Sequence, residues 1–144
     1  MLVILASCCP LKNNKETKTE TVKTTEIKTV TIEDLQDKTW NWVETSMNND
    51  TKVVPKENSS FIVFAKDGRL NIQGDCNSGS TEFKLENKAF SVGPIMSTKK
   101  ACMDSKEKDF FNNLMAATSI FMNDGFLYVD LKMDSGTMKF AEKK

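Results

Sequence analysis

The chain contains no histidine, and this absence removes several kinds of chemistry at once. Serine–histidine and cysteine–histidine nucleophilic pairs need an imidazole base, and imidazole is the commonest metal ligand that a protein side chain offers. The aspartates also lack the spacing of a calcium-binding loop, and no two cysteines have the Cys-x-x-Cys spacing of redox motifs. The sequence therefore predicts no catalytic residue, no metal site and no cofactor, and we expect a protein that is not an enzyme.

A net charge is absent as well, because 20 basic residues balance 20 acidic ones. Without an overall positive field the chain has no general attraction for polyanions, and we expect no nucleic-acid partner. Its 144 residues, 39% of them hydrophobic, are enough for one compact domain with its own core plus a tail.

The N-terminus lacks a long hydrophobic run but has a short one. Residues 2–5 are apolar and lead into Leu5-Ala6-Ser7-Cys8, which resembles the bacterial lipobox, where small residues precede a cysteine that becomes lipidated. We expect residues 1–8 to be a truncated lipoprotein signal and Cys8 to carry the lipid. A complete signal has a basic start and about 7–15 apolar residues, whereas no Lys or Arg precedes Cys8 here. The alternative is a short apolar N-terminus with two free thiols.

Residues 9–34 are expected to form a disordered tether rich in Lys, Glu and Thr. No aromatic residue and few aliphatic ones occur between Lys12 and Lys38. Such a segment cannot bury enough apolar surface to offset the loss of backbone entropy on folding. Residues 25–31 alternate in a way that would also suit an edge strand, which stays the alternative for that part.

Residues 35–144 read as a folded domain made of short strands. Trp40 and Trp42 are two residues apart, so both rings lie on one face of a strand, where we expect core packing. Further alternating segments are separated by residues typical of tight turns: Asp67-Gly68, Asn87-Lys88, Asp124-Gly125 and Ser135-Gly136. Strands that follow one another through such short links favour an antiparallel sheet.

One helix is predicted, near residues 104–117. Asp104 and Glu107 have the spacing of a capping box, and Phe110, Phe111 and Leu114 begin an apolar stripe at helical spacing. The expected fold class is therefore mainly β (α+β): a small antiparallel β-barrel-like domain of about seven or eight strands with one packed helix.

Two short motifs and the helix carry a family resemblance. The motifs are Gly74-Asp75-Cys76-Asn77-Ser78-Gly79 and Ser97-Thr98-Lys99-Lys100-Ala101-Cys102, and the helix adds Glu107. Together they resemble the META domain of HslJ-like bacterial envelope proteins over roughly residues 35–141, although Gly79 departs from the usual spacing. The resemblance implies a small β-barrel with a packed helix, often in lipoproteins, and a connection with stress or drug tolerance, but no established catalytic activity. It marks these residues as structural or binding residues: Gly74, Asn77, Gly79, Ser97, Thr98 and Glu107.

Cys76 and Cys102 are the only cysteines in the body of the chain. In an oxidising envelope compartment two nearby thiols form a disulfide, so we expect these two to be bonded and to stabilise the domain by about 3.5 kcal/mol in the chain-entropy model. A reactive thiol at Cys76, or a redox pair, is the alternative, which Lys99 and Lys100 beside Cys102 keep open.

These observations favour a non-catalytic, lipid-anchored interaction module of the bacterial cell envelope. Cys8 would attach it to a membrane, with the outer membrane expected, and the domain would lie in the periplasm or at the cell surface. Its expected partner is another envelope protein or a cell-wall component. The alternative is a lipocalin-like binder of a small apolar ligand inside the barrel, although bulky Phe, Met and Trp side chains would fill a small barrel. An enzyme that uses carboxylates or a thiol is the third hypothesis, for which the sequence offers no set of residues.

Overall fold

The computed structural model describes residues 27–144. The lipobox with Cys8 and residues 9–26 of the expected tether lie outside the described residues.

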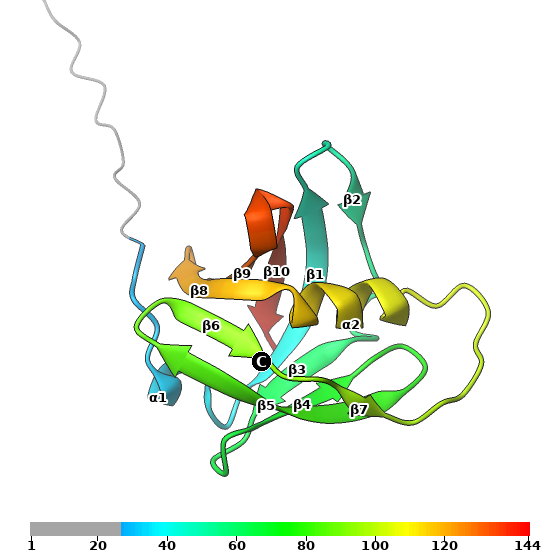
Figure 1. Ribbon diagram of the computed structural model, residues 1–144, viewed down its shortest axis with the longest axis horizontal. Helices are drawn as coiled ribbons and strands as arrows, with labels where there is room; N and C mark the ends of the chain where they lie inside the picture. Colours follow the sequence, from blue (N-terminus) through cyan, green and yellow to red (C-terminus); the bar gives the residue numbers. More distant parts are fainter. Residues whose placement is uncertain (1–26) are drawn as a thin grey trace, which may run out of the picture.

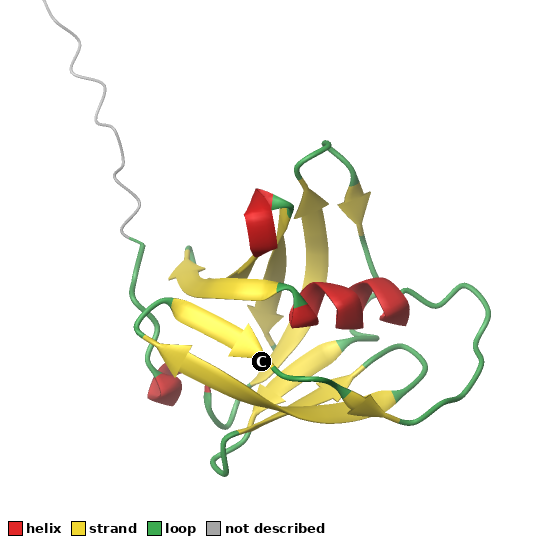
Figure 2. Ribbon diagram, in the orientation of Figure 1, coloured by secondary structure: helices red, strands yellow, loops and turns green. Residues whose placement is uncertain are grey.

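Ten strands and three short helical segments make up the described part of the chain (Figures 1 and 2). In chain order they are α1 (Ile32–Leu35), β1 (Thr39–Met47), β2 (Lys52–Val53), β3 (Phe61–Phe64), β4 (Arg69–Gln73), β5 (Ser78–Glu86), β6 (Ala89–Val92), β7 (Met96–Ser97), α2 (Glu107–Met115), β8 (Ala117–Asn123), β9 (Phe126–Leu131), the 3-10 helix η1 (Lys132–Asp134) and β10 (Gly136–Glu142).

Eight of the strands close into an antiparallel barrel. Neighbours pair in the order β10-β9-β8-β6-β5-β4-β3-β1, and β1 pairs again with β10, which closes the ring. β2 extends the sheet beside β1, and β7 pairs with β5 outside the ring. The fold class is therefore the mainly β barrel with one main helix that the alternation of short strands and turns predicts.

Three tight hairpins form where turn residues were expected. In the turns after β3 and β8, Gly68 and Gly125 have φ of 81° and 79°. Asn87 and Asp124 also lie in the left-handed region, with φ of 56° and 49°. Glycine, asparagine and aspartate adopt this conformation at low cost, which is why these residues fix the register of the strands on either side.

The core fills the inside of the barrel with aromatic and aliphatic side chains. Trp40 and Trp42 are 0% and 2% exposed, which confirms that both rings of β1 face inward. Their indole N–H groups donate to Leu35 O (3.2 Å) and to Thr45 Oγ1 (3.1 Å), so no buried donor of the two rings stays unpaired.

Helix α2 packs its apolar stripe into this core. Phe110 and Leu114 are fully buried, and the Phe110 ring stacks on Trp42 with 4.7 Å between centroids. The helix begins at Glu107 and ends at Met115, so it is shorter than the sequence suggested. In particular, Asp104 does not cap it, because Asp104 lies in the preceding turn with φ of 57°.

Of all neighbouring strands in the barrel, β6 and β8 have the fewest paired residues. These strands share a single residue pair, Ala89 with Ser119, supported by a hydrogen bond from Ile120 N–H to Lys88 O (3.0 Å). Elements outside the ring cover the rest of this seam. At one end α2 packs against β6, and at the other Lys28 exchanges two backbone hydrogen bonds with Met122 on the same edge of β8 (3.3 and 3.4 Å).

The folded domain therefore starts earlier than the expected boundary at residue 35. Val30 is 2% exposed and belongs to the core, and α1 follows directly. The Asp34 carboxylate binds Lys28 Nζ (2.9 Å) and accepts from the N–H and hydroxyl of Thr31 (both 3.1 Å). These donors, the Lys28 ammonium first, lower the pKa of Asp34 to about 2. Residues 27–34 were expected to belong to the tether, and here a buried valine and a helix cap hold this polar segment against the core.

We expect Val30→Ala to lower the free energy of unfolding by about 1–3 kcal/mol, because it opens a cavity beside the β6–β8 seam. The measurement is the midpoint of urea unfolding. Ile27→Ala, at a side chain that is 56% exposed, is the matched control and should change the free energy by less than about 0.5 kcal/mol. Equal effects of the two substitutions would show that residues 27–30 do not belong to the folded unit.

Candidate functional site

The residues that carry the family resemblance meet where the β4–β5 connection touches the segment between β7 and α2. The first segment contributes Gly74 and Asn77, and the second contributes Thr98 and Glu107. Gly79 and Ser97 lie beside them as an antiparallel pair of β5 and β7. The fold thus brings all six residues into one neighbourhood from positions up to 33 apart in the sequence, as between Gly74 and Glu107.

Asn77 is the centre of this cluster and is only 5% exposed. Its amide nitrogen donates to Glu107 Oε1 (2.7 Å) and to Lys100 O (3.1 Å). Its amide oxygen accepts from Lys100 N–H (2.7 Å) and from Thr98 Oγ1 (2.9 Å). A side-chain amide has two donors and can accept twice, so the hydrogen-bonding capacity of Asn77 is fully used.

Glu107 joins the helix to the same centre. One carboxylate oxygen binds the Asn77 side chain, and the other accepts from the Asn77 backbone N–H. The carboxylate lies directly over Gly74, where an added Cβ would come within 2.9 Å of Glu107 Cγ. Position 74 therefore needs a glycine because of this close approach.

Asp75 caps the helix in place of Asp104. Its carboxylate accepts from Lys106 N–H (2.9 Å) and from the Ser105 hydroxyl, and Ser105 Oγ accepts in turn from Glu107 N–H (3.1 Å). The spacing of Asp104 and Glu107 suggested a local capping box, but the cap comes from a distant loop. A cap from 31 residues away leaves no signal in the local sequence.

A disulfide between Cys76 and Cys102 links the same two segments, with 6.0 Å between the Cα atoms. This is the pairing that the sequence predicts. Cys102 is exposed, and both cysteines line a small hollow together with Lys100, Lys108 and Phe111.

Gly79 and Ser97 are packed rather than hydrogen-bonded through side chains. A Cβ at position 79 would lie 2.8 Å from Met96 O and 3.2 Å from Ser97 Cβ, so the glycine lets β7 approach β5. Ser97 itself is exposed, and its role as a binding residue stays a prediction.

This arrangement is suited to holding two loops and a helix together. The Asn77 amide donates to the Glu107 carboxylate and to Lys100 O, and the carboxylate accepts from the side chain and the backbone N–H of Asn77. Within residues 27–144 no group of three or more His, Cys, Asp or Glu side chains is placed to hold a metal ion.

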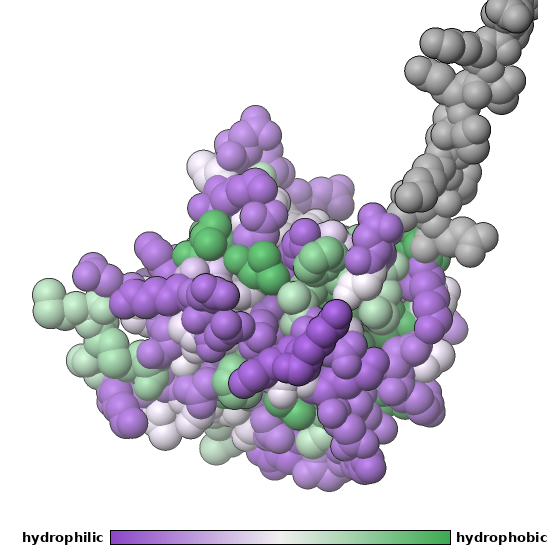
Figure 3. Space-filling view, turned by 180° about the vertical axis from the view of Figure 1, so that it is seen from behind, coloured by the Kyte–Doolittle hydropathy of each residue, from purple (hydrophilic) through white to green (hydrophobic). Residues whose placement is uncertain are grey.

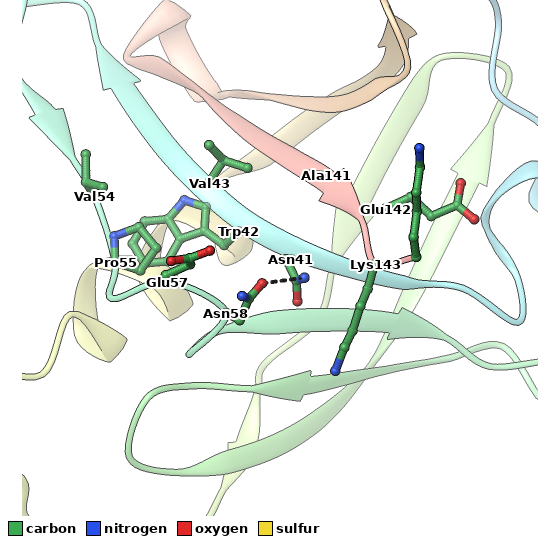
Figure 4. Close-up of a pocket in the computed structure, with 11 residues that line it drawn as sticks. Asn41, Trp42, Val43, Val54, Pro55, Glu57, Asn58, Ala141, Glu142 and Lys143 are labelled. Carbon is green, nitrogen blue, oxygen red and sulfur yellow. Dashed lines mark hydrogen bonds between the residues drawn. The ribbon is translucent and has the colours of Figure 1, made fainter.

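The largest of the hollows described here lies elsewhere, on the outside of the barrel beside β1 (Figure 4). It has a volume of about 740 Å³, within the range of small-molecule sites, roughly 300–1,000 Å³. Its apolar lining comes from Val43, Val54, Pro55 and Ala141, and its polar rim includes Asn41, Asn58, Glu57 and the C-terminal residues 142–144. Asn41 donates to Asn58 Oδ1 (2.9 Å), which holds the loop 54–58 against β1. We call this hollow the β1 groove.

Sequence reasoning did not find the β1 groove. Its lining comes from three separate segments, 41–43, 54–58 and 141–144. The pairing of β1 with β10 brings Asn41 opposite Ala141, so no local sequence pattern predicts this groove.

Residues 33–144 match the family model of the META domain, which covers the whole barrel. The match includes the six residues that carry the resemblance, Gly74, Asn77, Gly79, Ser97, Thr98 and Glu107, which we call the signature residues. The chain belongs to the META domain family. No curated protein matches the chain, so the family and the fold are what the comparisons establish.

Two solved structures share this META fold at low sequence identity. A protein from Burkholderia xenovorans, solved by NMR, is 17% identical with a TM-score of 0.70 and covers 90% of this chain and 98% of its own. A DUF4847 family protein from Bacteroides vulgatus is 15% identical with a TM-score of 0.61, covering 78% of this chain and 96% of its own.

We expect Asn77→Ala to destabilise the domain strongly, because Lys100 N–H and Glu107 would each lose a buried partner at about 1–3 kcal/mol per group. The free energy of unfolding should fall by at least about 2 kcal/mol in urea without reductant. Asn112→Ala, at an exposed position of α2, is the matched control and should be nearly neutral. A stable Asn77→Ala domain would mean that the amide serves binding instead of the fold.

Proposed function

We propose that this META domain protein is a non-catalytic, lipid-anchored module of the bacterial cell envelope that binds another envelope component in connection with stress or drug tolerance. The observation that supports binding over catalysis is the use of the signature residues. The polar side-chain atoms of Asn77, Glu107 and Asp75 form hydrogen bonds inside the domain. What remains for function is the outer surface, which offers a groove for a partner.

The compartment is part of the same proposal. The disulfide between Cys76 and Cys102 is of the kind that persists in oxidising compartments such as the periplasm or the cell surface. The Leu5-Ala6-Ser7-Cys8 motif supports attachment through acyl chains on Cys8, and stable anchoring needs more than one such chain. No helix among residues 27–144 has the length and hydropathy to cross a bilayer.

The anchor is tested by replacing Cys8 in the protein expressed in a bacterium that processes lipoproteins. Cys8→Ala should move the protein from the membrane fraction to the soluble fraction, because the only acylation site is lost. Cys9→Ala is the matched control and should stay with the membrane. Membrane residence of the Cys8→Ala protein would refute the lipid anchor.

A second candidate function is the binding of a small molecule, which the β1 groove favours. The barrel interior is a poor place for such a ligand, because Phe110 stacks on Trp42 there, and Phe64 contacts both Phe83 and Phe90. A ligand would therefore lie on the outer face, between the loop 54–58 and β10.

Intact mass measured under native and then denaturing conditions separates the two candidates. For the protein purified from its native envelope without reductant, we expect the same mass in both measurements. A mass that falls on denaturation would identify a carried molecule and put the second candidate first. Ala141→Trp, which fills the β1 groove, should then abolish the carried mass, whereas Thr118→Trp, at an exposed position on another strand, should not.

A further inference from the structure

An unusual stretch of surface runs from β7 into the segment before α2. Nine consecutive residues, 96 to 104, are exposed, and they include two large apolar side chains. Met96 is 77% exposed and Met103 is 92% exposed. Methionine is flexible and polarisable, which suits it to adaptable contact surfaces. We call residues 96–108 the Met–Lys loop.

The Met–Lys loop is fixed in place although it is exposed. Asn77 holds Thr98 and the backbone of Lys100, the disulfide holds Cys102, and Asp75 holds Ser105 and Lys106. The two methionines are therefore presented by a rigid segment, and little conformational entropy is lost when they are buried.

The charge of this loop differs from the zero net charge of the chain. Lys99, Lys100, Lys106 and Lys108 are all exposed, and none of them takes part in the ion pairs found within residues 27–144. Asp75 and Glu107 keep their negative charge, but both are partly buried in the cluster, where they accept hydrogen bonds from uncharged groups. The exposed acids of the loop and the first turn of α2 are Asp104 and Asp109. The exposed side chains there are thus four lysines against two acids, and positive charge predominates among them.

The loop also lies on a free side of the molecule. In Figure 1 it projects at the right, whereas the described chain enters at the left with residue 27. Figure 3 views the molecule from behind, so the right side of Figure 1 appears at the left. Hydrophobic surface projects at this left edge. The loop shares no residue with the β1 groove, so both surfaces can be used together.

We propose that the Met–Lys loop docks on an anionic lipid surface. Met96 and Met103 enter the boundary between headgroups and acyl chains, and the four lysines contact headgroup phosphates. Apolar burial combined with basic side chains is what binds peripheral segments to anionic membranes. The proposal does not depend on Cys8, because the loop contacts the membrane by itself.

The test is flotation of the full chain carrying Cys8→Ala, so that no lipid anchor contributes, with vesicles of defined composition. Vesicles containing phosphatidylglycerol should bind the protein at least about tenfold more strongly than vesicles of phosphatidylcholine alone, and added salt should weaken the binding. Lys99→Glu with Lys100→Glu should lower the partition coefficient by about tenfold or more. Met103→Ser should lower the partition coefficient but leave its salt dependence unchanged, because the substitution removes an apolar contact and no charge.

Matched controls come from another part of the surface. Met133→Ser, at a methionine that is 93% exposed, and Lys84→Glu with Lys88→Glu, at two exposed lysines, change the same residue types and should leave the partition coefficient unchanged. Unfolding midpoints of all variants verify that the fold is intact. Equal effects of loop and control variants, or equal binding to both vesicle types, would overturn the proposal. Binding to soluble polyglutamate without binding to any vesicle would overturn it as well, because the partner would then be an acidic polymer.

Discussion

The pairing of the Glu107 carboxylate with Asn77 is the interaction on which the rest of the structure depends. It fixes the first turn of α2 against the β4–β5 connection, with Gly74 leaving room for the carboxylate. Through Asn77 it also holds the backbone of Lys100, and so the whole segment before the helix. Buried polar networks of this kind stabilise a fold only when every member is satisfied, and here the amide of Asn77 uses all of its capacity. The disulfide adds a covalent link between the same two segments.

The barrel depends on parts that are not barrel strands. Between β6 and β8 a single residue pair closes the ring, so the wall relies on α2 at one end and on the backbone of Lys28 with Val30 at the other. This explains why a polar segment ahead of the META family match, which begins at residue 33, is part of the folded unit. It also couples residues 27–30 to the seam.

The signature residues serve the fold of the domain. Residues that a family has in common invite interpretation as an active site, yet here the amide, the carboxylates and both glycines are consumed by local packing. The surfaces that remain are the β1 groove, with its mixed apolar and polar lining, and the Met–Lys loop, which the signature cluster itself holds rigid. In this view the cluster supports function indirectly, by presenting a preorganised loop.

The sequence by itself determined the eight barrel strands, the tight turns, the apolar face of the helix and the partners in the disulfide. Each follows from local alternation, from residues that tolerate positive φ, or from there being only two cysteines in the domain. It also carried the family resemblance through Asn77 and Glu107. Tertiary structure alone decided the start of the domain, where Val30 needs a preformed core, and the helix cap, where Asp75 acts from 31 residues away. It likewise decided the β1 groove and the exposure of Met103, since burial depends on which distant segments happen to cover a residue.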